Sequence, residues 1–261
     1  KPRKSAAGRK PYDAILMFKL LVLASLYNLS DEQTQYQVQD RLSFLRFLGL
    51  RLGDAVPDAT TLWLFREALS EGGLVQELFG KFGAYLEAQG YRAQKGQIVD
   101  ASIISVPKQR NTREENETVK RGEIPAAWKE DSAKLSQKDL EARWTKKNGK
   151  SYFGYKNHID VDCKHKLIRR FELSDAALHD SQMLDSLLDR KNRGAGVWAD
   201  SAYRSKEQEK KLKRWEYRSQ IQYKGKREKP LSPYYRKINH LRSRIRVRVE
   251  HVFGAQENSL G

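Results

Sequence analysis

The sequence predicts an α/β (α+β) protein, in which an all-helical N-terminal part precedes a mixed sheet flanked by helices. Two observations predict this class. Apolar residues recur at helical spacing from about residue 12 to residue 90, and after Gly96 short strand-like runs alternate with helical segments. The 261 residues are 39% hydrophobic, enough for a sizeable core. We therefore expect two domains, 1–92 and 93–261.

Four helical segments are expected in the N-terminal part. A mostly apolar first helix ends near Asn28, and Ser30 opens a second helix, because Gln33 follows it at the spacing of a capping box. A third apolar stretch covers 42–50, and Asp58 is the expected N-cap of the next helix. This order is compatible with a helix-turn-helix that contacts DNA and equally with a plain helical bundle.

The C-terminal part alternates strands and helices. We expect strands at 97–104, 152–161, 167–173, 197–199 and 217–223, and helices at 181–190 and 205–215. Residues 107–150 are strongly charged and contain Asn, Gly and Pro breakers, which predicts an insertion or long loop with a functional role.

The charge balance indicates a polyanionic partner. Fifty Lys and Arg oppose 33 Asp and Glu, giving a net charge of +17 and a pI of about 9.8. Nucleic acid is favoured over a membrane surface, because the basic residues are spread along the chain and mixed with Trp and Tyr. The charged 107–150 segment suits contact with DNA.

No membrane segment or disulfide is expected. The longest apolar run, 14–27, contains Lys19 and is too short to span a bilayer, and no signal peptide opens the chain. Cys163 is the single cysteine, without a partner pattern for a catalytic thiol. These features predict a cytoplasmic protein.

Three acids are candidates for chemistry. Asp100 and Asp200 each end an apolar strand-like run, and Glu250 is the lone acid in a run of Arg and apolar residues. Three carboxylates that converge repel one another unless cations neutralise them, and two Mg²⁺ ions about 4 Å apart would do so. The acids therefore predict a two-metal phosphoryl-transfer site, with Mn²⁺ as the expected substitute.

The segment before Glu250 carries two conflicting signals. Ten Lys or Arg lie between Lys224 and Glu250, and Ser232 followed by Pro233 predicts a helix start. However, alternation of Arg with Ser, Ile and Val over 242–249 predicts a strand.

Several segments together resemble the DDE transposases of the insertion sequence 5 family. They are Ile98-Val99-Asp100-Ala101-Ser102, Tyr155-Lys156-Asn157-His158, His179-Asp180-Ser181-Gln182, Ala199-Asp200-Ser201-Ala202-Tyr203 and Arg248-Val249-Glu250-His251-Val252-Phe253-Gly254. The N-terminal Leu29-Ser30-Asp31-Glu32-Gln33 and Arg41-Leu42-Ser43-Phe44 also resemble that family's helical domain. The similarity covers nearly the whole chain.

The resemblance implies a ribonuclease H-like catalytic domain with Asp100, Asp200 and Glu250 as catalytic and metal-binding residues. It places Glu250 on a helix, against the alternation signal, with Arg246 one turn earlier to bind a DNA phosphate or hold the carboxylate. It also implies that 1–92 serves DNA binding and dimerisation, in a homodimer that binds terminal inverted repeats and joins their ends to target DNA. The expected location is the bacterial cytoplasm, in association with the nucleoid.

The chain departs from the broader signature of that family at two places. Ser243 and Glu257 stand where a Tyr and a Lys are typical, so neither role is carried over. The sequence starts without Met and stops at Gly261, soon after Glu250, which predicts C-terminal truncation.

Further candidates surround the three acids. Expected DNA contacts are Arg204, Arg242, Arg246, Arg248 and Lys156, while His158, His179 and Tyr203 are candidates for a supporting layer around the carboxylates. For His158 a purely structural role is the stronger alternative, and His179 with Asp180 is also a candidate helix cap. Asp160 and Asp162 are expected on a solvated edge.

Two other functions stay open. One is a DNA-binding protein descended from a transposase, which has lost catalysis. The other is a ribonuclease H-like metal-dependent nuclease that cuts without joining.

Overall fold

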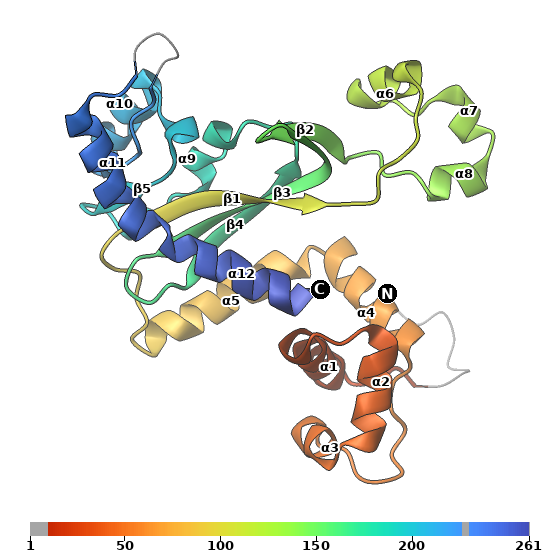
Figure 1. Cartoon of the computed structure of the whole chain (residues 1–261). Helices are drawn as coiled ribbons and strands as arrows, with labels where there is room; N and C mark the ends of the chain where they lie inside the picture. The colour runs from red at the N-terminus through yellow and green to blue at the C-terminus, as the bar shows by residue number, and fades with distance from the viewer. Residues whose placement is uncertain (1–9, 226–229, 261) are drawn as a thin grey trace. The chain divides into compact units, whose positions relative to one another are not determined.

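The computed structural model describes residues 10–225 and 230–260, and its chain divides into two compact units (Figure 1). One unit comprises Lys1–Gly90 with Phe253–Gly261, and the other comprises Tyr91–Val252. Three cations of the expected basic stretch, Lys226, Arg227 and Lys229, lie outside the described residues.

The first unit is helical. Its helices are α1 (Ala14–Tyr27), α2 (Asp31–Asp40), α3 (Leu42–Leu48), α4 (Ala59–Glu71) and α5 (Leu74–Ala88). Their core consists of Met17, Leu20, Leu23, Val38, Phe44, Leu45, Leu48 and Leu62. Local sequence sets the boundaries: Asn28 ends α1 in a left-handed conformation, Ser30 and Gln33 form the expected capping box, and Asp58 caps α4.

The second unit is built on a six-stranded mixed sheet. Its strands are β1 (Gln97–Ser105), β2 (Arg143–Lys147), β3 (Lys150–Asp162), β4 (Ile168–Asp175), β5 (Gly196–Trp198) and β6 (Arg218–Ser219). The long β3 pairs antiparallel with β1, β2 and β4, whereas β5 is parallel to both β1 and β6. The predicted fold class, a mixed sheet with helices after a helical N-terminal region, is confirmed.

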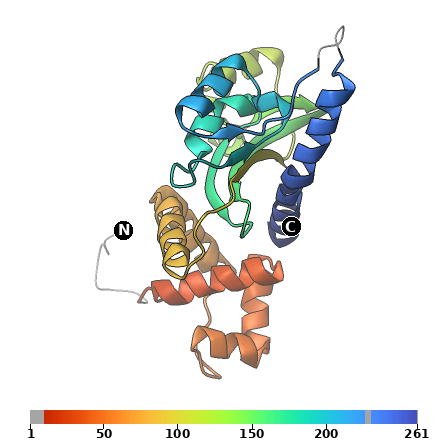
Figure 2. The ribbon, with the colours of Figure 1, turned by 90° about the vertical axis from the view of Figure 1, so that its left-hand side faces the viewer.

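Different elements pack on the two faces of this sheet. Val99 of β1 packs in a core with Leu184 and Leu187 of α9 (Leu184–Leu187) and Leu212 of α10 (Lys206–Arg214). Because side chains alternate along a strand, Asp100 points to the opposite face. That face is approached by α11 (Pro233–Arg246) and the first turn of α12 (Arg248–Leu260), seen in blue at one side of the sheet in Figure 2.

One glycine sets the close approach of β1 and β5. Gly96 has φ +99°, and a Cβ atom there would collide with the backbone oxygen of Gly196. Only glycine therefore lets the chain enter β1 so near to β5. The resulting pair of parallel strands positions the two candidate aspartates.

Two expected elements are much shorter than predicted. The helix expected at 181–190 consists of the 3-10 turn η1 (Asp180–Gln182) and the single turn α9, and the strand expected at 217–223 is reduced to β6. A buried contact explains the first difference: the Gln97 amide bonds both the backbone N–H and the carbonyl of Asp189, which holds the chain extended there.

The charged segment 107–150 is structured. It contains α6 (Arg113–Lys120), α7 (Ala126–Lys129), α8 (Ser132–Ser136) and β2. Trp128 is fully buried and its indole N–H donates to Glu115 at 2.7 Å, so the segment has a small core of its own. Figure 1 shows these short helices beyond the end of β1.

No single described helix is both long and apolar enough to cross a bilayer. The helices α1 and α2 reach that length and composition only as a pair, bent by 101°.

Candidate active site

Asp100 and Asp200 occupy equivalent positions on neighbouring strands. In the parallel β1–β5 pair, Gln97 lies opposite Val197 and Ile98 opposite Trp198. Both aspartates come two residues after the last pair, and the backbone of Asp200 is still extended. Neighbouring strands lie about 4.8 Å apart, so the backbone itself brings the two carboxylates to one edge of the sheet.

Arg246 provides the positive charge at this edge. Its guanidinium, at the last residue of α11, forms an ion pair with the Asp100 carboxylate. The same Nη1 lies 3.6 Å from Oε1 of Glu250 in the first turn of α12. Arg246 therefore connects the first and third candidate acids.

The environment of Asp100 disfavours its charged form. Burial raises the pKa of Asp100 to about 6; Arg246 and the Ala101 N–H oppose this rise, while Asp200 and Glu250 add to it. The carboxylates of all three predicted residues therefore interact electrostatically. Such a cluster of like charges is what a divalent cation would stabilise, and carboxylate oxygens are the ligands that Mg²⁺ prefers.

The three acids do not converge in a metal-coordinating arrangement. Among the residues described, no group of three Asp, Glu, His or Cys side chains is placed to hold a metal ion. Glu250 is also more than half exposed, whereas Asp100 is nearly buried. The three candidate ligands are carboxylates, which suit Mg²⁺. In this structure, however, the guanidinium of Arg246 is the counter-ion of both Asp100 and Glu250.

A second layer of polar residues comes from elements that adjoin the two aspartates, namely β3, η1 and the turn after Asp200. His158 is buried and its Nε2 lies 2.8 Å from the Ser174 hydroxyl; burial lowers the pKa of His158. His179 accepts a hydrogen bond from the Ser181 N–H and so caps η1. The turn η2 (Ser201–Tyr203) directly follows Asp200 and ends with the buried Tyr203.

Asp180 belongs to this layer and was not among the predicted site residues. It forms an ion pair with Lys156 at 2.8 Å, and η1, which carries it, packs against η2. Its presence in the segment His179-Asp180-Ser181-Gln182 was the signal that could have identified it.

The predicted DNA contacts are all engaged within the protein. Arg204 and Arg242 both donate to the Ile221 carbonyl and lie against the Tyr223 ring at 4.0 and 4.7 Å. Arg248 donates to the Cys163 carbonyl, and Lys156 is held by Asp180 and the Leu178 carbonyl. These contacts give each cation a structural role, and contact with DNA stays a prediction.

The expectation of a solvated edge at Asp160 and Asp162 is wrong, because both are completely buried. Asp162 accepts hydrogen bonds from three backbone N–H groups and forms an ion pair with Arg169, so it organises the turn after β3. Neither oxygen of Asp160 has a hydrogen-bond partner in the described part of the chain, and burial raises its pKa well above the usual value. Cys163 is buried, and burial raises the pKa of its thiol to about 12, which argues against nucleophilic use.

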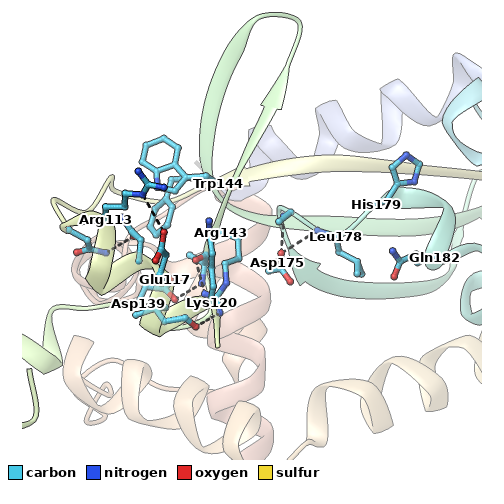
Figure 3. A pocket seen from close by; sticks show the side chains of 16 residues that line it. Arg113, Glu117, Lys120, Asp139, Arg143, Trp144, Asp175, Leu178, His179 and Gln182 are labelled. Atoms are coloured by element: carbon cyan, nitrogen blue, oxygen red, sulfur yellow. Dashed lines mark hydrogen bonds and ion pairs between the residues drawn. The ribbon is translucent and has the colours of Figure 1, made fainter. Parts of the chain in front are cut away.

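A cavity of about 1010 Å³ separates the 107–150 segment from the turn after β4 (Figure 3). Arg113, Lys120 and Trp144 line one side of it, and His179 and Gln182 of the η1 region line the other. Trp144 is partly exposed and packs on Phe153 with ring centroids 5.2 Å apart. The cavity thus combines an aromatic surface and three cations with three acids, Glu117, Asp139 and Asp175, and Glu117 is paired with Arg113 at 3.2 Å.

Two family models match successive parts of the chain. Residues 91–261 match the family described as "Transposase DDE domain", and residues 1–68 match "Transposase domain (DUF772)".

Two solved structures are similar at low identity. The chain is 13% identical to "Mos1 transposase paired-end complex with left transposon end", covering 84% of this chain and 61% of that one with a TM-score of 0.26. For "Crystal structure of the Mos1 Strand Transfer Complex" the identity is 14%, the coverage 84% and 60%, and the TM-score 0.23. The chain thus spans about three fifths of these structures.

Proposed function

Because the chain belongs to the Transposase DDE domain family, which uses divalent metal ions, we propose that it is the transposase of an insertion sequence of the insertion sequence 5 type. It binds the terminal inverted repeats of the element, cleaves DNA strands at their ends and joins the resulting 3′-hydroxyls to target DNA. The quoted segments around Asp100, Asp200 and Glu250 support this assignment.

One observation carries the proposal: Asp100 and Asp200 stand at the same level of two parallel strands, with Arg246 linking Asp100 to Glu250. Asp100, Asp200 and Glu250 would hold two Mg²⁺ ions, with Mn²⁺ as a substitute. Metal ions so bound would activate the attacking oxygen and stabilise the leaving oxygen at phosphorus.

The chain's own residues position this chemistry. The sheet edge fixes Asp100 and Asp200, while the position of Glu250 in the first turn of α12 lets it approach them from the helix side. With Asp100 engaged by a bound cation, the guanidinium of Arg246 would be free to donate to a phosphate oxygen of the DNA, which suits its planar donors.

The 107–150 segment and its cavity are the proposed route of the DNA beside the site. Arg113 and Lys120 would neutralise backbone phosphates, and the exposed face of Trp144 would pack against the sugar or base. The net charge of +17 supports a partner with many phosphates.

We also propose that the protein acts as a homodimer. Helix α5 buries none of its side chains and exposes Leu74, Leu78, Phe82 and Tyr85, which share one helical side. Sedimentation equilibrium of the protein with end DNA would detect the dimer, and a monomer on two-ended DNA would contradict it.

The test is strand cleavage and joining by the full-length protein on DNA that carries the element ends. Asp100→Asn, Asp200→Asn and Glu250→Gln are each expected to abolish Mg²⁺-dependent products while DNA binding persists. Asp185→Asn is the matched control, because Asp185 pairs with Lys211 at the surface of α9 and α10. Wild-type rates in Asp100→Asn would remove the assignment.

The same experiment separates the alternatives. Repeat binding without any metal-dependent cleavage would indicate a DNA-binding protein descended from a transposase. Cleavage of DNA that lacks the repeats, with no joined product, would indicate a nuclease.

A further inference from the structure

The two sides of helix α11 differ in character. Its inner side carries, at three- and four-residue spacing, Asn239, Arg242, Ser243 and Arg246. The Asn239 amide bonds the backbone N–H and the carbonyl of Tyr223, and Arg246 pairs with Asp100. This side therefore fixes the helix against its own unit, with its last residue at the candidate site.

The outer side of α11 is a stripe of four exposed residues at the same kind of spacing, Tyr234, Lys237, Leu241 and Arg244. Tyr234 is 68% exposed and Leu241 is 52% exposed. Helix α11 contains no Asp or Glu, and within residues 10–225 and 230–260 neither Lys237 nor Arg244 forms an ion pair. The stripe therefore combines two apolar surfaces with two cations that no carboxylate neutralises.

The ring of Tyr234 is held in place without being covered. It meets the ring of Tyr235 edge-on, with the ring centroids 5.4 Å apart. One exposed aromatic residue is ordinary on a protein surface. A restrained ring in line with Leu241 and two cations, however, is a surface suited to a flat ligand that carries negative charge.

Charge and shape favour single-stranded DNA as the partner of this stripe. Proteins bind such strands by stacking bases on aromatic side chains and by pairing phosphates with cations along the same path. Within a duplex each base is covered by its neighbours, so only an unpaired or terminal base can lie flat on Tyr234. A second copy of this chain suits the stripe poorly, because each copy carries a net charge of +17.

The stripe is long enough for several nucleotides and leads to the candidate site. Arg246 follows Tyr234 by 12 residues, which is about 18 Å along a helix. Since one strand of B-DNA rises about 3.4 Å per nucleotide, about five nucleotides cover this length. A strand that follows the stripe therefore reaches the guanidinium that pairs with Asp100.

We propose that the outer side of α11 is a track for a single DNA strand. On this track Tyr234 stacks a base, Leu241 packs against a sugar or a second base, and Lys237 and Arg244 pair with phosphates. The inference deepens the proposed function and rests on it for the destination of the strand, which is the site at Asp100. The track shares no residue with the cavity beside 107–150.

The experiment measures binding by the full chain to a fluorescein-labelled single-stranded oligonucleotide of mixed sequence and to the duplex of the same sequence. Anisotropy is recorded at several salt concentrations in EDTA, and melting temperatures check that each variant folds. The variants are Tyr234→Leu, Tyr234→Phe, Lys237→Gln and Arg244→Gln. Lys213→Gln is the matched control, because Lys213 is an exposed cation of another helix, α10.

Tyr234→Leu is expected to weaken binding of the single strand by roughly tenfold, the value of one stacked base, and to weaken duplex binding much less. Tyr234→Phe keeps the ring and should bind like the wild type. Lys237→Gln and Arg244→Gln should each reduce the slope of log affinity against log salt by about 0.7, the value per phosphate of a single strand. Lys213→Gln should leave that slope unchanged.

Wild-type affinity in Tyr234→Leu would overturn the inference. An equal loss in Tyr234→Phe would assign the contact to the hydroxyl, and an equal loss for the duplex would assign it to paired DNA; either result would also overturn it. The same holds if Lys213→Gln changes the slope as much as Lys237→Gln. A changed sedimentation coefficient of Tyr234→Leu with unchanged oligonucleotide affinity would assign the stripe to contact between two copies instead.

Strand cleavage separates this failure from failure of the proposed function. Binding in EDTA does not involve the metal site, so Tyr234-dependent binding by a protein that never cleaves DNA would support the track and contradict only its destination. If the wild type cleaves, Asp100→Asn does not, and Tyr234→Leu binds the single strand normally, only the track is wrong. In the active protein, Tyr234→Leu should raise the KM for DNA more than it lowers kcat.

Discussion

The guanidinium of Arg246 forms an ion pair with the carboxylate of Asp100, a residue 146 positions earlier in the chain. Because the carboxylate of Asp100 is nearly buried, its pKa is raised to about 6, and the positive charge of Arg246 opposes that rise. A divalent cation at Asp100 must therefore compete with Arg246.

Arg246→Gln is expected to increase Mn²⁺ affinity in the absence of DNA. Removal of one partly buried competing charge should tighten binding by about three- to tenfold. Calorimetric titration at pH 8, above the pKa of Asp100, measures it. Arg248→Gln is the control, because Arg248 contacts a backbone carbonyl. Equal Mn²⁺ affinity in Arg246→Gln and the wild type would show that Arg246 does not compete.

Asp160→Asn is expected to stabilise the protein at neutral pH. Burial first, and Asp189 next, raise the pKa of Asp160 in the folded protein. The folded protein therefore keeps Asp160 protonated, whereas the unfolded chain loses that proton above about pH 4. The contribution of Asp160 to stability is present below that pH and is lost as the pH rises toward the folded-state pKa. The stability difference between variant and wild type should therefore grow from pH 4.5 to pH 7.5, by up to about 1.4 kcal/mol per pH unit.

Urea unfolding at the two pH values measures this difference. Asp162→Asn is the comparison, because Asp162 is equally buried but fully hydrogen-bonded and paired with Arg169. That variant should lose stability at both pH values. A pH-independent effect of Asp160→Asn would contradict the buried, protonated state.

Tyr223→Leu is expected to destabilise the fold without changing DNA binding. The ring lies against the guanidinium groups of Arg204 and Arg242, and two such contacts are worth about 1–2 kcal/mol together. Thermal unfolding measures the loss. If the salt dependence of DNA affinity also becomes weaker, the two arginines contact DNA phosphates in addition to packing on Tyr223.

Lys120→Ala is expected to weaken DNA binding nonspecifically. Loss of one phosphate contact should reduce the slope of log affinity against log salt by about 1. Fluorescence anisotropy at several salt concentrations measures the slope. Lys120→Arg keeps the charge and should bind like the wild type; an unchanged slope in Lys120→Ala would exclude the cavity from the DNA path.

Local signals in the sequence were sufficient to predict where several helices begin. Ser30, Asp58 and Ser232 each cap the helix that was expected, because a cap depends on residues within one turn. At 242–249 the period-two alternation was misleading: α11 and α12 meet at Val247, and both are helical. The resemblance to a family resolved that conflict, whereas periodicity alone did not.

Features that depend on distant residues were not predictable. The helix expected after residue 181 stops early because Gln97, 92 residues away, binds the Asp189 backbone. Asp160 is buried because β3 lies between β1 and β4, so its charged neighbours in sequence say nothing about its exposure. Likewise, the partnership of Arg246 with Asp100 emerges only in the folded chain.

The parallel pairing of β1 with β5 affects how well the candidate site tolerates amino-acid substitutions elsewhere in the protein. The separation of Asp100 and Asp200 is set by backbone hydrogen bonds and by the glycine entrance to β1, so it does not depend on which side chains fill the core. Glu250, in contrast, is held by a helix that joins α11 at a single residue. Random substitution should therefore disturb the third acid far more often than it disturbs the spacing of the first two.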